Sequence, residues 1–346
     1  MSKQWNKMYA EKLLACIPVF FICLSSIAQD PTKVSIDSLP ADSIDIQKAL
    51  EGKIPNKAII TYTPTQQNKK RLQLAIAASI IGYGGSMAAL HIAWYRDYKQ
   101  TNFHFFNDNA EWLQMDKAGH VFSTYIGSRT AMEIWQYAGW SKKQAVWVGA
   151  TSGVVYQTII ETLDGFSEGW GWSWGDFSAN VLGAGLFAAQ ELWWNEQRLM
   201  MKFSTHFKSY PEGELKDRAK QMFGRKFNQR LLKDYNAQTI WISANLRSFL
   251  KQSTLPSWLN IAAGYSAEGM YEGKSNLWKD ANGVLHDRTD VPRYRQFYLA
   301  PDIDLTRIKT KNKVFKVLLF IANAAKFPTP SLELSQGKMK WNWIHF

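Results

Sequence analysis

This chain of 346 residues has only two cysteines, Cys16 and Cys23, and both lie within residues 1–28. If that segment is a leader that is removed, the remaining chain has no disulfide and no thiolate nucleophile. The sequence also lacks a Walker loop and the motifs GxGxxG, GxSxG and HExxH. Their absence argues against P-loop and Rossmann nucleotide-binding domains, α/β-hydrolases and zincin-type proteases.

Acidic residues are also scarce, with 29 Asp and Glu against 41 Lys and Arg. The amino terminus has the features of a secretory signal: an apolar run at 13–24, then Ser26 and Ala28 as small residues before a cleavage site. The basic residues that precede the run are Lys3, Lys7 and Lys12. Cleavage after Ala28 would remove these lysines and Glu11, which lowers the formal net charge from +12 to +10. We therefore predict an extracytoplasmic protein of the cell envelope, periplasmic or associated with the outer membrane.

The alternative is an uncleaved anchor and a multi-pass protein of the inner membrane. A mean hydropathy of -0.29 argues against a chain buried mostly in lipid, whereas 14% aromatic residues favour contact with a membrane interface. We expect membrane lipids or other envelope components as partners. Nucleic acid is not expected, because an exported protein seldom meets it, and neither a cofactor nor an oligomeric state is predicted.

The order of sequence patterns predicts an α+β protein, with a helical bundle followed by a small antiparallel β-rich region. About four main helices are expected, at 72–95, 116–138, 142–164 and 174–194. Alternating residues indicate strands from Tyr235 onward, with a final hairpin that turns at Gln336 and Gly337. The expected regions are a signal peptide at 1–28, a polar arm at 29–68, a helical bundle at 69–195, a basic helical connector at 196–234 and an aromatic β-rich region at 235–346.

The first expected helix has no charged residue between 72 and 95, which is long enough to cross a bilayer. Three of its residues suit close contact with another helix, and they are Gly82, Gly84 and Gly85. The later helices carry charges that are costly in lipid, at Arg129, Glu133 and Glu161. We therefore expect a compact bundle that is membrane-associated and partly embedded, rather than four independent membrane spans.

Polar residues at helical spacing predict a site inside the bundle. Asp116 and His120 are four residues apart, Glu161 and Asp164 are three apart, and Asp176 and Asn180 are four apart, so each pair shares a helix face. Gly183 continues the face of Asp176 and Asn180 and allows another backbone to approach closely. The cores of helical bundles are common places for sites built from facing helices.

Three interpretations of these residues stay open. In an enzyme that acts on a lipid or glycan-lipid, His120, Glu161 and Asp164 would be the catalytic group, with His120 as general acid or base. The substrate-binding residues would then be Asp116, Lys117, Asp176 and Asn180. In a second interpretation His120 and the carboxylates hold an oxygen-preferring divalent ion, although the usual ligand spacings are missing and no metal is predicted. In the third, the residues form a polar network that only fixes the packing of the helices.

The same stretches resemble a known family. FHFFNDNAEWLQMDKAGH, IIETLDG and SWGDFSANVLGA are similar to the YfiM-like family of predicted periplasmic lipoproteins, a domain of unknown function, in the longer form found in Bacteroidetes-type bacteria. The resemblance covers residues 70–195. A more distant similarity is to VanZ-type membrane proteins, and it implies the positions Asp116, Lys117, His120, Glu161, Asp164, Asp176, Asn180 and Gly183. Neither family implies a reaction, and Cys16 and Cys23 depart from the lipoprotein pattern because both are poor acylation sites. The function expected is therefore a structural or docking role in the envelope, with the envelope enzyme as the alternative.

Overall fold

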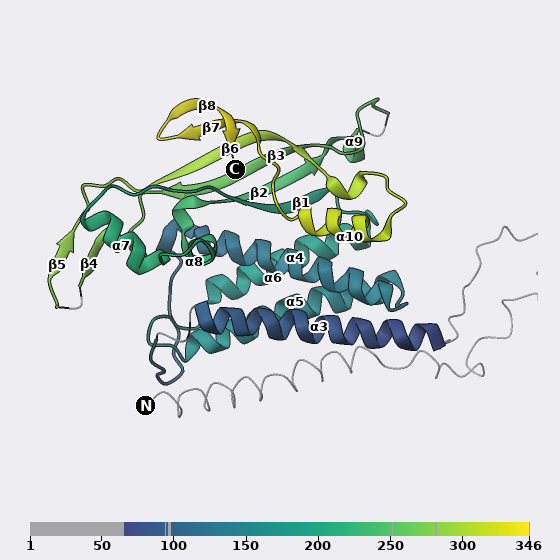
Figure 1. Cartoon of the computed structure of the whole chain (residues 1–346), viewed down its shortest axis with the longest axis horizontal. Coiled ribbons are helices and arrows are strands. Elements are labelled where there is room, and N and C mark those ends of the chain that lie inside the picture. The colour runs from purple at the N-terminus through teal and green to yellow at the C-terminus, as the bar shows by residue number, and fades with distance from the viewer. Residues whose placement is uncertain (1–65, 94, 96–97, 251, 281, 346) are drawn as a thin grey trace, which may run out of the picture.

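The computed structural model describes residues 66–93, 95, 98–250, 252–280 and 282–345. The predicted signal peptide and nearly all of the predicted polar arm lie outside these residues. The chain forms two layers, a helical bundle and a sheet that lies along it (Figure 1). This arrangement confirms the predicted α+β class, with helices in the first half and an antiparallel sheet in the second.

Four long helices make up the bundle: α3 (Gln66–Ala93), α4 (Met115–Tyr137), α5 (Lys142–Gly165) and α6 (Trp174–Trp193). The helix starts are set by local chemistry. Ser141 and Gln144 form a reciprocal capping box at the start of α5, and the Ser173 hydroxyl accepts a hydrogen bond from the Asp176 N–H at the start of α6. Both caps satisfy N–H groups that have no partner within the helix.

Glycines bring α5 and α6 against α4. A Cβ at Gly153 of α5 would lie 2.3 Å from Oγ of Ser128, and one at Gly183 of α6 would lie 2.3 Å from the carbonyl oxygen of Val121. Both distances are far below van der Waals contact, and at Gly183 the near atom is backbone, so only glycine fits there. Because Gly183 follows Asp176 and Asn180 on α6, this close approach brings those two side chains toward α4.

The expected close contact at Gly82, Gly84 and Gly85 does not occur within the described part of the chain. A Cβ at any of these three positions of α3 would meet nothing there within 4 Å. α3 contacts α5 instead through larger side chains, with the Tyr83 hydroxyl 3.1 Å from Oγ of Ser152 and the Ser86 hydroxyl 2.7 Å from the Tyr156 hydroxyl.

Six antiparallel strands form the main sheet, in the order β1-β2-β3-β6-β7-β8. They are β1 (Leu199–Thr205), β2 (Gln238–Asn245), β3 (Leu259–Glu268), β6 (Tyr294–Ile303), β7 (Thr329–Ser335) and β8 (Lys338–His345). The predicted final hairpin is present, and its turn is at Gln336 and Gly337. The expected basic helical connector differs in one respect, since its first part forms β1 rather than a helix.

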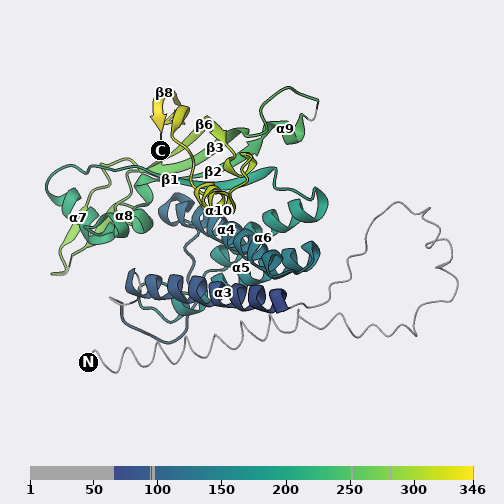
Figure 2. The same cartoon turned by 45° about the vertical axis from the view of Figure 1, so that its right-hand side comes forward.

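The remaining elements lie mostly at the ends of the two layers (Figure 2). Helices α7 (Glu214–Phe223) and α8 (Phe227–Lys233) lie near the hairpin of β4 (Leu277–Lys279) and β5 (Leu285–Asp287). Helix α9 (Leu246–Phe249) follows β2, and α10 (Lys313–Ala322) lies between β6 and β7 in the sequence. Short 3-10 turns occupy Glu111–Gln114, Tyr235–Ala237 and Leu305–Arg307.

The buried side of the sheet combines a small apolar cluster around Trp241 and Tyr298 with a polar network. Nζ of Lys202 lies 2.8 Å from Oδ2 of Asp302, and both side chains are fully buried. The Ser243 hydroxyl donates to the same carboxylate, and the Asn260 amide donates to Ser243. These bonds link β1, β2, β3 and β6 through side chains as well as through the backbone.

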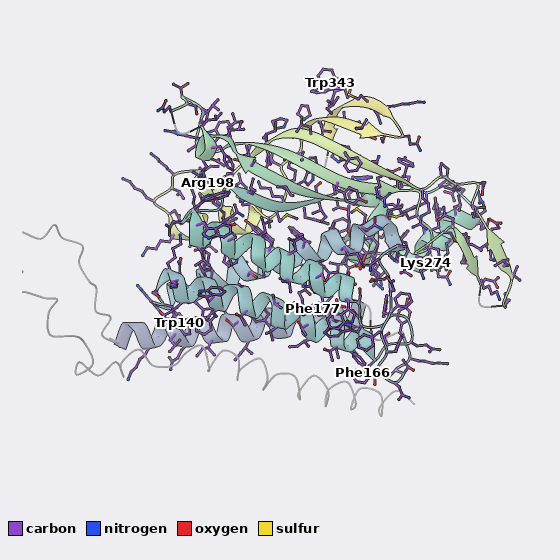
Figure 3. The ribbon with its side chains drawn as sticks, turned by 180° about the vertical axis from the view of Figure 1, so that it is seen from behind. Trp140, Phe166, Phe177, Arg198, Lys274 and Trp343 are labelled. Carbon is purple, nitrogen blue, oxygen red and sulfur yellow. The ribbon has the colours of Figure 1, made fainter. Side chains whose placement is uncertain are left out.

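The opposite side of the sheet is apolar. Near β1 and β2 it packs against α4, where the rings of Phe122 and Phe203 lie 5.8 Å apart. Farther along, Phe297 pairs with Leu334, and both are about half exposed. Trp343 on the edge strand β8 is also exposed, and it projects away from the bundle (Figure 3). An exposed apolar sheet side of this kind is typical of an interaction surface.

The close approach at Gly183 gives a direct test of the packing. We expect Gly183→Ala to destabilise the protein by about 1–3 kcal/mol, because its methyl group would overlap the Val121 carbonyl. Gly185→Ala on the same helix is the control, because a Cβ there meets nothing within 4 Å and alanine favours helix. Thermal unfolding followed by circular dichroism measures both variants, and equal unfolding temperatures would contradict this packing.

Candidate functional site

A left-handed turn positions the start of α4, which carries three residues of the site. Trp112, Leu113 and Gln114 have φ angles of 47°, 50° and 64°, a region that side-chain-bearing residues seldom adopt in succession. The β layer holds this turn in place. The Trp112 N–H donates to the carbonyl of Gly273 at 2.8 Å, and the Tyr265 hydroxyl donates to the carbonyl of Leu113. Strained backbone held by its surroundings is common at functional sites.

The segment before this turn is pinned to the α5–α6 loop. The His104 N–H donates to the Gly165 carbonyl, and His104 and Phe106 exchange backbone hydrogen bonds with Trp172, all at 2.9 Å. Figure 3 shows the bundle end where Phe166 and Phe177 lie. This pairing places Asp108 beside α4 and α6.

Lys117 is the cation at the centre of the cluster. Its Nζ lies 2.7 Å from Oδ1 of Asp108 and 2.9 Å from Oδ1 of Asp176, and Oδ2 of Asp116 is 3.8 Å away. The Ser173 hydroxyl also donates to Asp108, at 2.6 Å. One lysine therefore ties together the segment before α4, the start of α4 and the start of α6.

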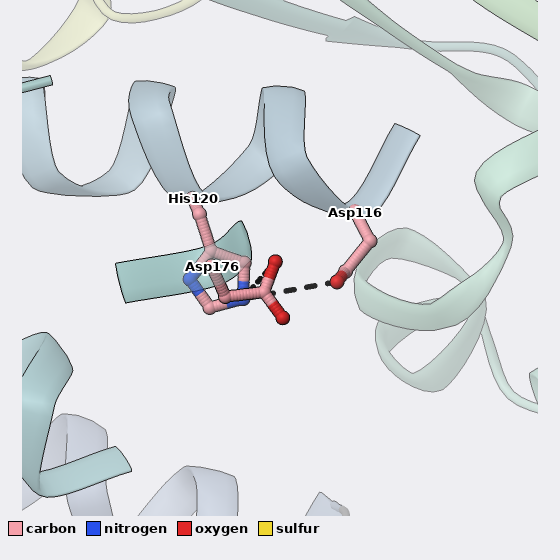
Figure 4. A group of neighbouring side chains, drawn as sticks. All are labelled: Asp116, His120 and Asp176. Atoms are coloured by element: carbon pink, nitrogen blue, oxygen red, sulfur yellow. Dashed lines mark ion pairs between the residues drawn. The ribbon is translucent and has the colours of Figure 1, made fainter. Parts of the chain in front are cut away.

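His120 lies one turn farther along α4. Its Nδ1 is 3.0 Å from Oδ1 of Asn180 and 3.7 Å from Oε1 of Glu161. Its Nε2 lies 3.8 Å from Oδ1 of Asp116 and 4.0 Å from Oδ1 of Asp176 (Figure 4). The imidazole thus stands between an amide on one side and two carboxylates on the other.

Asp164 lies apart from this contact group. Its Oδ1 accepts a hydrogen bond from the Tyr95 hydroxyl at 2.8 Å, which ties α5 to the residues after α3. The structure brings together the other six predicted residues: Asp116, Lys117, His120, Glu161, Asp176 and Asn180.

Burial makes the carboxyl groups of α5 hard to ionise. Burial, together with the nearby charge of Asp164, raises the pKa of Glu161 to about 9. Burial also raises the pKa of Asp164 to about 7, even though its hydrogen bond from Tyr95 acts in the opposite direction.

The carboxyl groups of Asp108 and Asp176 are hydrogen-bonded to each other, and their pKa values are shifted in opposite directions. Burial, and then the charge of Asp116, raises the pKa of Asp176 to about 10. Burial acts in the same direction on Asp108, but its hydrogen bonds from Asp176, Lys117 and Ser173 outweigh it and lower the pKa of that carboxyl. Burial would lower the pKa of Lys117, yet the adjacent carboxylates raise it, so the lysine stays charged.

Two residues of the cluster were not among the predicted site residues. Asp108 lies in the stretch that carries the family resemblance, but it precedes the helix expected at 116–138, so helical spacing does not place it beside Asp116. Tyr235 comes from the chain after α8, and its hydroxyl donates to Oδ1 of Asp116 at 2.8 Å. Nothing in the local sequence indicates that contact, because 119 positions separate the two residues.

Residues 104–190 match the family described as "Predicted periplasmic lipoprotein (DUF2279)". The match covers about a quarter of the chain and includes every predicted site residue. It supports an envelope domain of unknown function and agrees with the extracytoplasmic location that the amino terminus predicts. No curated protein and no solved structure matches the chain. The likeness to YfiM-like and VanZ-type proteins stays a prediction.

The raised pKa of Glu161 predicts how stability depends on pH in metal-free buffer. A carboxyl whose pKa is raised by folding contributes stability that is complete below its ordinary value of 4.5 and is lost as the pH rises toward 9. We expect Glu161→Gln to make this fall shallower and to stabilise the protein above pH 8 by about 1–3 kcal/mol, because glutamine stays neutral.

Unfolding temperatures between pH 5 and 9, measured with EDTA present, test this expectation. Glu133→Gln is the matched control, because Glu133 is an exposed carboxylate on α4, and its profile is expected to follow the unsubstituted protein. Parallel profiles for Glu161→Gln and the unsubstituted protein would show that Glu161 is ionised in the folded state.

Proposed function

We propose that this envelope protein is membrane-associated and docks onto lipid through the outer side of α3. The observation that carries this proposal is the exposure of α3. Residues Lys69–Ile92 form a stretch of 24 residues that is long and apolar enough to cross a membrane, and only 11% of its most apolar part is buried inside the protein. At 1.5 Å per residue such a stretch is about 36 Å long, enough for the hydrocarbon core of a bilayer.

The exposed positions of α3 are large aliphatic side chains. Leu74, Ile80 and Ile81 are among the most exposed, with Ile81 at 72%. The opposite side of the helix packs on α5, where Met87 joins Leu163 in a small apolar core. One side of α3 is thus held by the bundle, while the other presents apolar surface that is unfavourable in water.

The charge around α3 favours lipid as its partner. Lys69, Lys70 and Arg71 stand at the start of the apolar stretch, where they suit anionic headgroups. The amino-terminal segment directs the chain to the envelope, where membranes are the available apolar phase. The apolar stretch is as long as the hydrocarbon core of a bilayer is thick, whereas contact with a partner protein would not require any particular length.

Helix α10 supplies a second surface of the same chemistry. No residue of this helix is buried, and its exposed apolar residues are Val314, Phe315, Val317, Leu318 and Ile321. Exposed lysines precede and interrupt it, at Lys309, Lys311, Lys313 and Lys316. Apolar residues flanked by lysines are typical of helices that lie at a membrane surface.

The enzymatic alternative has one supporting observation. The side chain of His120 is 17% exposed, so a small molecule in solvent can reach the cluster. We give this function second place, because the apolar surfaces of α3 and α10 need a partner whether or not His120 acts on a substrate.

Substitutions on α3 test lipid docking. We expect the full chain to stay in the membrane pellet after a sodium carbonate wash and the double variant Leu74→Asp, Ile81→Asp to be released, because two carboxylates on the outer side oppose contact with hydrocarbon. The control is Val284→Asp, Leu285→Asp, which makes the same change at exposed apolar positions around β5. Equal retention of the two double variants would exclude α3 as the docking element and shift attention to α10 or the sheet.

A further inference from the structure

We propose that Asp116, His120 and Asp176 bind one divalent transition-metal ion. These residues offer one imidazole nitrogen and two carboxylate oxygens, all within 4.8 Å of one another. They come from the first two turns of α4 and the first turn of α6, and the relative position of these helices is set by the contact of Gly183 with Val121. The site is independent of lipid docking, because none of its residues belongs to α3 or α10.

The hydrogen bond of His120 determines which nitrogen faces the carboxylates. Its Nδ1 lies 3.0 Å from the amide oxygen of Asn180, so a neutral imidazole donates through Nδ1. The lone pair on Nε2 is then directed toward Asp116 and Asp176 (Figure 4). A nitrogen lone pair that faces two carboxyl oxygens is an arrangement that a bound cation would stabilise.

The distances suit a bound ion. Ligand atoms about 2.1 Å from a metal lie about 3–4 Å from one another. Nε2 of His120 is 3.8 Å from the Asp116 oxygen and 4.0 Å from the Asp176 oxygen. Small side-chain movements would therefore complete three ligand positions and leave others for water.

Each candidate ligand is oriented by a neighbour. The Tyr235 hydroxyl donates to Asp116, Lys117 donates to Asp176, and Asn180 accepts from His120. Metal ligands are commonly held in this way by a second layer of hydrogen bonds, which fixes the histidine tautomer and the direction of the carboxylates.

Unpartnered polar atoms beside the group also indicate a ligand. Glu161 is 1% exposed, and its Oε1, which is 3.7 Å from the His120 ring, has no hydrogen-bond partner among the described residues. The amide nitrogen of the fully buried Asn180 likewise has none within the described part of the chain. Buried polar atoms are rarely left unsatisfied, and water or a small ligand within the cluster would supply partners for them.

Charge also favours a cation. The group and its immediate neighbours contain the four carboxyl groups of Asp108, Asp116, Glu161 and Asp176, with Lys117 as their cationic contact. Lys117 can compensate the charge of one ionised carboxylate among them. A divalent ion would compensate most of the remaining negative charge.

The ligand set indicates the class of ion. An imidazole nitrogen suits Zn²⁺, Fe²⁺ and similar ions, whereas Ca²⁺ and Mg²⁺ prefer oxygen alone. One nitrogen with two carboxylate oxygens therefore favours a transition-metal ion, and Zn²⁺ is the probe to use first.

The test uses the mature chain without a histidine tag, purified in detergent and dialysed against EDTA. We expect isothermal titration with Zn²⁺ to show one ion bound per chain, and Co²⁺ to give visible d–d absorption bands that differ from those of the hexaaqua ion and report its coordination geometry. We expect His120→Ala to weaken Zn²⁺ binding at least 100-fold and to abolish the Co²⁺ bands. Asp116→Asn is expected to weaken binding as well, and it keeps the test valid if His120→Ala fails to fold.

Glu133→Gln is the matched control, because it removes an exposed carboxylate from the same helix. Its Zn²⁺ affinity is expected to equal that of the unsubstituted protein, and circular dichroism checks that each variant is folded. Absence of Zn²⁺ binding by the folded, unsubstituted protein would overturn the proposal. Unchanged affinity in folded His120→Ala and Asp116→Asn would overturn it too, since binding would then take place elsewhere.

Discussion

The pairing of Lys117 with Asp108 and Asp176 is the interaction on which the helical layer depends. It joins the segment before α4, the start of α4 and the start of α6 through bonds of 2.7 and 2.9 Å. A buried carboxylate without such a partner would be strongly unfavourable, so the lysine allows several acidic groups to gather in one place. His120 and Asn180 extend this arrangement one turn deeper into the bundle.

The two layers depend on each other at the same point. Residues of the β layer hold the left-handed turn at Trp112 and Leu113, and Tyr235 fixes Asp116. Without these contacts from the β layer, the start of α4 would not be held in place, and neither would its cluster residues Asp116, Lys117 and His120. The apolar surfaces on α3 and α10 lie outside this arrangement, which leaves them available to dock the protein onto a membrane.

Much of the site could be predicted because it follows helical spacing. Asp116 with His120, and Asp176 with Asn180, share helix faces whatever the tertiary structure, and Gly183 continues the second face. Asp108, Tyr235 and β1 could not be predicted in this way. Their places depend on a strained turn and on contacts between distant parts of the chain, and neither leaves a periodic signal. The glycines of α3 show that a sequence pattern can also suggest a contact that the described structure does not form, because small residues permit close contact but do not require it.

The most direct test of the role of Lys117 is a double-mutant cycle on Lys117 and Asp176, measured by unfolding in EDTA. Lys117→Met and Asp176→Ala are each expected to destabilise the protein, because the first leaves Asp108 without its cation and the second removes an acceptor of the lysine. The double variant is expected to lose less than the sum of the two, with a coupling free energy of at least about 1 kcal/mol. Strictly additive losses would show that the two side chains act independently, which would contradict a central role for Lys117 in holding the helices together.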